Sequence, residues 1–297
     1  MLACMVRTVV EALRHALTRL PDLPSARADA EELVSRLLGM GRGGVLLDRE
    51  RALVPAEVER LESWLTRRAA GEPVQYITGR AAFRGLDLAV NPSVLVPRPE
   101  TEGLVEAVLD VLRAEAERWR APRVLDLGTG SGAIALAIAA EYPAAVVAAS
   151  DASEAALATA EENANALGLS ARVRFARGDW FGAVGGDERF EVVVSNPPYV
   201  ATGEWDLLPD DVRRFEPQQA LFSGATGLEA LREIVDDAPL HLVAGGLLAL
   251  ELAEMRAGAA SRCSTISPDA RACCSPGASA APRSRRCSGR RRGSRGN

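Results

Sequence analysis

Several residue types are scarce in this chain of 297 residues, and each scarcity excludes a class of protein. His15 and His241 are the only histidines, and four of the five cysteines follow residue 256. A zinc site needs a cluster of these residue types, so we predict no metal site. A disulfide-stapled secreted fold needs paired cysteines in its body, so the expected location is cytoplasmic.

Long apolar runs and a basic surface are also missing. No run reaches the roughly 18 apolar residues of a membrane span, and the first residues lack the pattern of a secretory signal. Lysine is absent, so arginine supplies every basic side chain. Nine arginines and one aspartate follow Arg256, which gives the tail a net charge of +8. Because the whole chain has a net charge of −5, residues 1–256 carry −5 − 8 = −13. An acidic body argues against binding to phosphate backbones. We therefore expect no membrane contact, no nucleic-acid partner and a monomer.

The first 73 residues are predicted to form a small helical domain. The stretches "VVEALRHALTRL" and "ARADAEELVSRLLGM" place apolar residues three and four apart, and Pro55 suits the first turn of a third helix. A packing module and a substrate-docking domain both remain open. Residues 74–96 alternate in polarity and contain Gly79 and Gly85, which predicts a hairpin linker.

From Pro122 onward, β-rich runs alternate with helical ones, after a helix expected to begin near Thr101. The predicted strands are "RVLDLG", "AAVVAAS", "ARVRFARG", "FEVVVS" and "GGLLALEL". Strands that are buried on both faces and separated by helices form parallel sheets. Residues 97–256 are therefore predicted to be an α/β domain with a doubly wound, mostly parallel sheet.

A glycine-rich loop follows the first of these strands and precedes a helix. Asp151 ends the next strand, where a carboxylate can accept both hydroxyls of a ribose. This pattern also fits a dinucleotide-binding dehydrogenase. Asp126 favours another ligand, because a buried carboxylate beside the loop is costly unless it meets a group such as the ammonium of S-adenosylmethionine. The loop residues are Gly128, Thr129, Gly130, Ser131 and Gly132.

Two further motifs follow later strands of the sheet. Asp179 and Trp180 follow the third strand, where an adenine ring would lie, although simple packing also explains them. The fourth strand ends in Asn196-Pro197-Pro198-Tyr199. Asparagine and the backbone there offer carbonyl acceptors, the prolines offer no N–H, and the tyrosine ring can cover a planar –NH2 group. Such a site would orient a weakly nucleophilic amine toward a sulfonium methyl group.

These motifs resemble the HemK-type methyltransferases, which methylate the glutamine amide of the Gly-Gly-Gln motif in peptide chain release factors. The resemblance rests on "GEPVQYITG", "VLVPRPETEGLVE", "VLDLGTGSGAIALAIA", "SNPPYV" and "FEPQQALFSGATGLEALREI", and it covers residues from about 8 to 254. It implies a Rossmann-like class I methyltransferase fold, S-adenosylmethionine as cofactor and release factors as protein substrates.

The resemblance also implies residue roles. The glycine loop would bind the methionine part of the cofactor, Asp151 its ribose and Asp179-Trp180 its adenine edge. Asn196 would touch both cofactor and glutamine amide, and Pro197, Pro198 and Tyr199 would complete the amide pocket. Arg98, Glu100 and Thr101 would line the pocket or form its lid, unless they only make a turn and a cap.

Three alternatives remain open at this point. The substrate glutamine could belong to a ribosomal protein, because the tetrapeptide Asn196-Pro197-Pro198-Tyr199 does not distinguish a release factor from a ribosomal protein as substrate. An amino-methyltransferase acting on adenine or guanine would need a basic face or a recognition domain, which the acidic body lacks. A protein of another class, an inactive remnant or a binding module, is favoured only by the tail.

Residues 257–297 do not continue the pattern of the family. They are rich in Arg, Ser and Cys without periodicity, and this composition predicts disorder. We hypothesise a reading-frame shift near residues 255–262. The genomic DNA sequence tests this hypothesis: a shifted frame that reaches an early stop codon or encodes polar residues would refute it. Because the lost strands would expose a sheet edge, such a chain would bind cofactor weakly.

Overall fold

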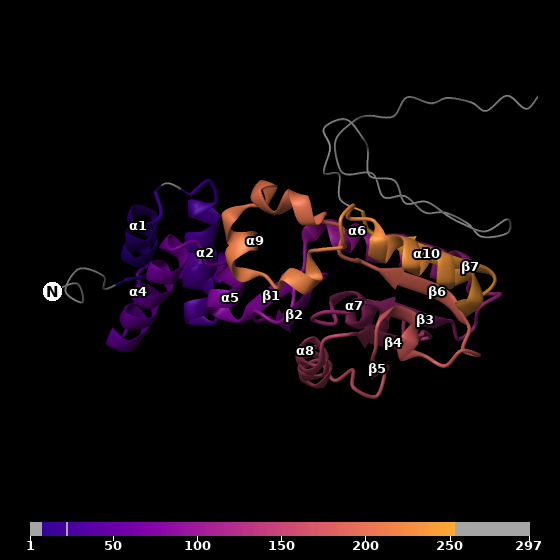
Figure 1. The fold of residues 1–297 in the computed structure, drawn as a ribbon. Helices are drawn as coiled ribbons and strands as arrows, with labels where there is room; N and C mark the ends of the chain where they lie inside the picture. The colour runs from indigo at the N-terminus through magenta and orange to yellow at the C-terminus, as the bar shows by residue number, and fades with distance from the viewer. Residues whose placement is uncertain (1–7, 22, 253–297) are drawn as a thin grey trace, which may run out of the picture.

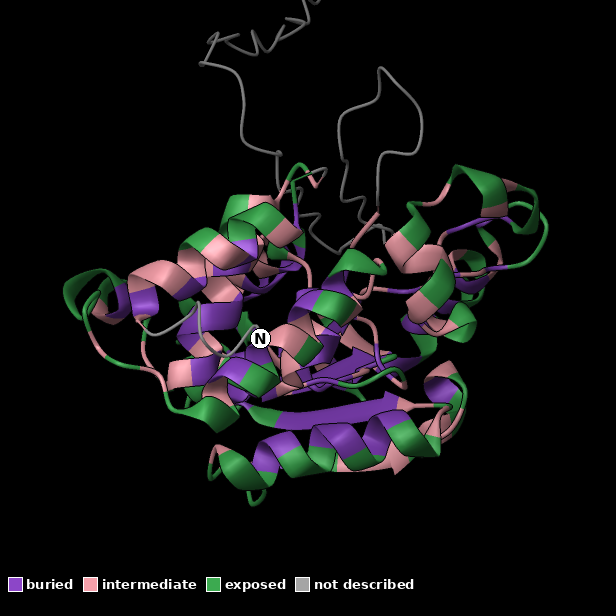
Figure 2. Cartoon of the chain, turned by 90° about the vertical axis from the view of Figure 1, so that its left-hand side faces the viewer, coloured by how far each residue is buried: buried purple, intermediate pink, exposed green. Residues whose placement is uncertain are grey.

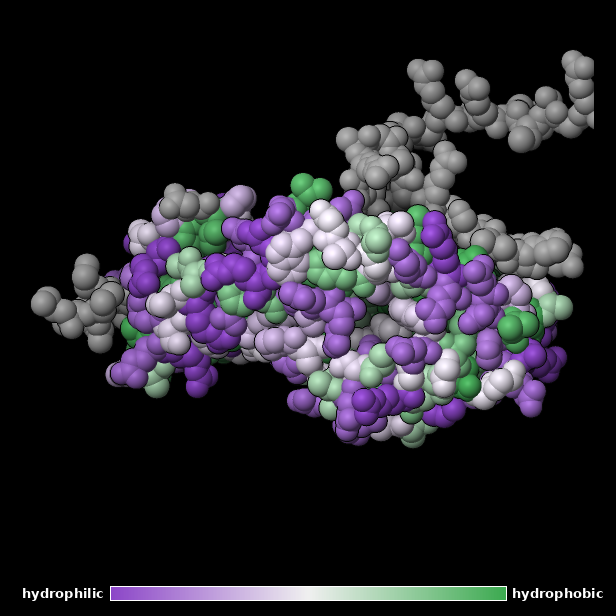
Figure 3. Space-filling view, viewed as in Figure 1, coloured by the Kyte–Doolittle hydropathy of each residue, from purple (hydrophilic) through white to green (hydrophobic). Residues whose placement is uncertain are grey.

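The computed structural model describes residues 8–21 and 23–252. The predictions for residues 257–297, and the reading-frame hypothesis for residues 255–262, lie outside these ranges. Within them, no helix is long and apolar enough to cross a membrane. On the face drawn in Figure 3, hydrophobic side chains lie in separate patches among hydrophilic ones.

A group of helices forms the N-terminal part of the molecule (Figure 1). Thr8 and Glu11 form a capping box at the start of the first helix, Pro55 occupies the first turn of α4, and Gly39 ends α2 with a φ of 62°. Apolar faces of these helices enclose their own core, which includes Leu33 and Leu61. The helices are α1 (Val9–Arg19), α2 (Ala26–Leu38), α3 (Arg42–Leu47), α4 (Pro55–Ala69) and α5 (Val74–Thr78).

The hairpin forms over a shorter range than the sequence predicted. Strands β1 (Arg80–Phe83) and β2 (Leu86–Ala89) pair in antiparallel fashion, whereas residues 74–78 form helix α5. The hairpin itself therefore covers only residues 80–89, because Gly79, with a φ of 71°, caps a helical turn instead of bending a strand.

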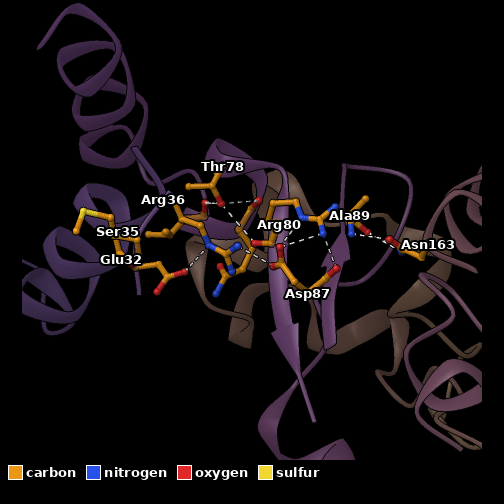
Figure 4. A network of polar contacts seen from close by, with 11 residues as sticks. Glu32, Ser35, Arg36, Thr78, Arg80, Asp87, Ala89 and Asn163 are labelled. Atoms are coloured by element: carbon orange, nitrogen blue, oxygen red, sulfur yellow. Dashed lines mark hydrogen bonds and ion pairs between the residues drawn. The ribbon is translucent and has the colours of Figure 1, made fainter. Parts of the chain in front are cut away.

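The hairpin connects the helices to the sheet domain (Figure 4). Arg36 of α2 donates to the Asp87 carboxylate at 2.7 Å. At the other end, the Asn163 side chain exchanges two hydrogen bonds with the backbone of Ala89, at 2.6 and 3.0 Å. Asn163 also donates to the carbonyl of Ser131 at 2.9 Å. The glycine loop is thus held in part by the hairpin.

Five strands form one parallel sheet, in the order β5-β4-β3-β6-β7. The order reverses at β3, which lies between β4 and β6, and this is the crevice where ligands bind in open α/β sheets. The predicted fold class is therefore confirmed. The elements are α6 (Pro99–Ala114), β3 (Arg123–Leu127), α7 (Ala133–Glu141), β4 (Val146–Asp151), α8 (Glu154–Ala166), β5 (Val173–Arg177), β6 (Phe190–Ser195), α10 (Glu229–His241) and β7 (Leu242–Leu250).

Helices cover both faces of this sheet, and its three inner strands, β4, β3 and β6, are mostly buried (Figure 2). One face packs against α6 and α7, whose apolar side chains include Leu109 and Leu136. The other packs against α10, which contributes Ile234 and Ala238. Because both faces are covered, only the ends of the strands can present polar groups to a ligand.

A segment between β6 and α10 reaches back toward the helical part; we call residues 201–224 the flap. It contains the short helices η3 (Thr202–Leu207), α9 (Asp210–Phe215) and η4 (Gln218–Ala220). In Figure 1, α9 lies between the N-terminal helices and α6. Arg214 of α9 donates to the carbonyl of Ala70, at the end of α4, at 2.9 Å. The flap therefore touches both parts of the chain.

Candidate active site

A cavity of about 380 Å³ lies at the carboxyl ends of the central strands. Its wall combines the loops after β3, β4, β5 and β6 with residues 93–98 and with Gln219 and Ala220 of the flap. The predicted residues on the wall are Arg98, Thr101, Gly128, Thr129, Gly130, Ser131, Asp151, Asp179, Trp180, Asn196 and Pro198. Those not on it are Glu100, Asp126, Gly132, Pro197 and Tyr199.

The glycine loop turns sharply between β3 and α7. Gly128, Gly130 and Gly132 all have positive φ, at 69°, 57° and 83°. A Cβ at Gly132 would lie 2.9 Å from Leu136, so only glycine fits against α7, whereas a Cβ at Gly130 would meet nothing within 4 Å. Gly132 serves packing, and Gly130 leaves its backbone open to the cavity.

Asp126 lies beneath this loop and is fully buried. Its Oδ2 accepts from the Thr129 hydroxyl at 2.6 Å and from the Ala135 N–H at 3.2 Å, while Oδ1 has no partner among residues 8–21 and 23–252. Burial raises the pKa of this carboxyl to about 7. Asp126 is placed to hold the loop, and its contact with a ligand ammonium group stays a prediction.

Asp151 ends β4 and faces the cavity. One oxygen accepts from the Gly130 N–H and the other from the Ser153 N–H, each at 2.9 Å. Burial raises the pKa of this carboxyl against those two bonds. Each oxygen has a further lone pair, so the carboxylate can still accept from two neighbouring hydroxyls.

Asp179 and Trp180 follow β5 at the same edge. Gly178 precedes them, and a Cβ there would lie 2.8 Å from the backbone of Ala183. Trp180 has a φ of 40°, which is uncommon for a bulky residue. A strained backbone at a cavity wall is typical of a functional site, and here it places an aromatic ring beside the loop glycines.

Asn196 follows the last residue of β6 and lies on the cavity wall. The preceding Ser195 is fully buried, and its hydroxyl donates to the Leu127 carbonyl at 2.6 Å, which ties the ends of β6 and β3 together. Pro198 lies on the wall, whereas Pro197 is buried behind it. Burial raises the pKa of the half-buried Tyr199, so its hydroxyl stays neutral. The backbone that carries the Asn196 amide is thus tied to the neighbouring strand at the cavity.

Arg98 precedes α6 and pairs with a residue of the flap. Its Nη2 donates to both carboxylate oxygens of Glu216, at 2.6 and 2.8 Å. The Glu216 side chain is 1% exposed, and burial raises its pKa against the pull of Arg98. This ion pair fastens the flap over the cavity. Glu100, by contrast, is exposed.

Some site residues were not found from the sequence. Gln219 lies in the quoted stretch "FEPQQAL", but nothing in its periodicity indicates that it reaches the cavity. Glu216 of the same stretch pairs with Arg98 of the cavity wall, and its sequence position does not indicate this either. Ser93, Val94 and Leu95 line the cavity from a segment that the sequence assigned only to the hairpin linker. The Pro-rich composition of that segment was the only available signal.

The geometry joins a cradle open to a nucleoside-like ligand with an amide at the same crevice, and the chain matches known proteins over most of its length. The family profile of the PrmC N-terminal domain matches residues 11–79, and that of the methyltransferase small domain matches residues 105–209. The chain is 48% identical, over 225 residues, to the release factor glutamine methyltransferase of Xylella fastidiosa. The aligned region covers 76% of this chain and 79% of the relative. This chain belongs to the release factor glutamine methyltransferase family.

Other members of the family cover a similar share of the chain. The relative from Gloeobacter violaceus is 43% identical over 242 residues, 82% of each chain. That from Bordetella pertussis is 45% identical over 231 residues, 78% of this chain and 82% of its own. Both are named release factor glutamine methyltransferase. The predicted family membership is thereby confirmed.

Proposed function

We propose that this chain methylates the side-chain amide nitrogen, N(5), of the glutamine in the Gly-Gly-Gln motif of peptide chain release factors, using S-adenosylmethionine. The observation that carries the proposal is the position of Asn196, an amide on the cavity wall directly after β6, beside the glycine loop. Membership in the family supports the choice of a glutamine amide as substrate.

The residues of the cavity fit this cofactor. Asp151 offers free lone pairs where two ribose hydroxyls would lie, and the Gly130 N–H is held by the same carboxylate. Trp180 and Asp179 would flank the adenine, and Gly128 to Gly132 would follow the methionine part. The bound cofactor supplies an electrophilic methyl group on a positively charged sulfur.

Orientation of the amide is the contribution of the protein. An amide nitrogen is a weak nucleophile because its lone pair is delocalised into the carbonyl group. The Asn196 carbonyl and the backbone carbonyls of the Asn-Pro-Pro stretch would accept its two N–H groups, and Tyr199 would cover its flat face. Held this way the lone pair points at the methyl carbon, and proximity supplies much of the rate. After transfer the nitrogen is acidic enough to lose its proton to water.

Protein docking is assigned to the helical part, residues 1–73, with residues 74–96 as linker and 97–256 as catalytic domain. The flap donates to Ala70 of the helical part and contributes Gln219 and Ala220 to the cavity wall, so the helical part lies next to the segment that borders the cavity. A monomeric state, a cytoplasmic location and the absence of nucleic-acid binding stay predictions.

The test is transfer of a labelled methyl group to a purified release factor. We expect label on the wild-type factor and none on a factor whose Gly-Gly-Gln glutamine is changed to Ala. Label on a ribosomal protein, or on RNA or DNA, with none on the release factor would replace the proposed substrate by one of its rivals. No transfer and no cofactor binding in a titration would favour an inactive remnant.

A further inference from the structure

Glu251 is a carboxylate at the cavity edge that the proposed reaction leaves unused. Strand β7 ends at Leu250, which is in register with Ser195 of β6. The Glu251 N–H donates to the Ser195 carbonyl at 3.0 Å. The ladder therefore places Glu251 beside the residue that follows Ser195, which is Asn196.

Three side chains meet there, from elements far apart in the sequence. The Nδ2 of Asn196 donates to the hydroxyl of Thr101, near the start of α6, at 3.3 Å. The side chains of Thr101 and Asn196 both act to lower the pKa of the Glu251 carboxyl, so this carboxylate lies within reach of both. Thr101 is 4% exposed, and Glu251 Oε2 is buried without a partner among the described parts of the chain.

We propose that Glu251 is a positioning residue: together with Thr101 it takes up both N–H groups of Asn196, so that the Asn196 carbonyl oxygen faces the cavity. The proposal rests on the proposed function, in which that oxygen accepts from the glutamine amide. Glu251 acts through Asn196 and has no place on the cavity wall.

The physical need for such a residue follows from the symmetry of an amide. The two ends of an asparagine side chain have nearly the same shape, and only their hydrogen-bond partners fix which end faces where. Turned over, Asn196 would present N–H donors to the N–H donors of the substrate. An ionised carboxylate only accepts hydrogen bonds, so Glu251 excludes the turned state.

The charge of Glu251 depends on its surroundings. Burial raises the pKa of its carboxyl above the usual glutamate value, and the neighbouring side chains of Thr101 and Asn196 oppose this rise. Glu100 raises the pKa further, and Arg98 lowers it. The nearby Tyr199 stays neutral, its own pKa raised by burial and by Glu251. Protonated Glu251 would donate a hydrogen bond and would no longer fix the orientation of the Asn196 amide.

A first experiment follows the Asn196 side chain itself, in the full chain with ¹⁵N label. Its –NH2 signals are assigned by their loss in Asn196→Ala. In the wild type we expect exchange with water at least about tenfold slower than in Glu251→Gln or Thr101→Val, because both variants remove an acceptor. The control Glu233→Gln, an exposed charge on α10, should keep the wild-type exchange rate.

A second experiment measures transfer to the release factor. For Glu251→Gln we expect kcat to fall about tenfold or more, with KM and the cofactor Kd changed by less than about twofold. The wild-type kcat should also fall on the acid side, at a pH above the usual glutamate range, and Glu251→Gln should lack this limb. Thr101→Ser, which keeps the hydroxyl, should retain most of the activity.

The outcomes separate this inference from the proposed function. Methylation by the wild type together with wild-type kcat and exchange in Glu251→Gln would overturn the positioning role. A parallel loss of kcat, cofactor affinity and thermal stability would also overturn it, in favour of a merely structural carboxylate. No methylation by the wild type would refute the proposed function, while the exchange rates of Asn196 would still decide the present proposal.

Discussion

The two halves of the cavity are built in different ways. In the cofactor half, the wall residues are fixed mostly by partners close in sequence: Asp126 holds Thr129, three residues away, Asp151 holds Gly130, 21 residues away, and Asn163 holds Ser131, 32 residues away. In the amide half, Arg98 holds Glu216 across 118 residues, and Asn196 meets Thr101 across 95. The first half depends mainly on consecutive βα units, with the hairpin adding one contact through Asn163, whereas the second joins segments that are far apart in the sequence.

The largest expected effect comes from a variant that disrupts only the cofactor half of the cavity. Replacing Asp151 by Ala removes the partner of the Gly130 N–H and the acceptor for the ribose. Hydrogen bonds to a charged group contribute about 1.5–3 kcal/mol each, so we expect the cofactor Kd to rise about 100-fold in a calorimetric titration. Asp151→Asn, which keeps the shape, should lose less. Wild-type affinity in Asp151→Ala would remove this residue from the cofactor site.

The next variant breaks the amide half. Arg98→Met leaves the buried Glu216 carboxylate without its partner. Because Arg98 is one-third exposed, we expect a loss of about 2 kcal/mol in the free energy of unfolding, below the usual figure for a fully buried pair. Urea denaturation measures it, and Arg98→Met combined with Glu216→Leu should recover more than half. If the double variant is as unstable as the sum of the single ones, the pair does not fasten the flap.

The smallest effect concerns Asp126, whose pKa is raised by burial to about 7. The folded state then holds this proton more tightly than the unfolded chain, so the free energy of unfolding falls as pH rises from the usual aspartate pKa to 7. Asp126→Asn cannot ionise. Between pH 5 and pH 8 we expect the free energy of unfolding of the wild type to fall by at least about 1 kcal/mol more than that of Asp126→Asn. If the free energies of unfolding of the two proteins depended on pH in the same way, the raised pKa of Asp126 would be contradicted.

The same contrast explains what could be predicted from the sequence. The alternation of strands and helices, the glycine loop and Asp151 follow from local patterns, and the parallel sheet brings their ends together. Glu216 and Glu251 carry no local signal, because their partners come from distant segments. Glu100 was expected at the pocket, but α6 begins at Pro99, so the turn of the helix directs Glu100 outward and buries Thr101.

The central claim is that Asn196 serves methyl transfer mainly by orienting the substrate amide, with its predicted contact to the cofactor adding little to cofactor affinity. It is tested most directly by measuring, for Asn196→Ala, both the cofactor Kd and the single-turnover rate of methyl transfer to a release factor. We predict a rate lowered by about 10³ or more, with the Kd changed less than about threefold. A rate near that of the wild type, or a loss of cofactor affinity that accounts for the whole loss in rate, would contradict the account.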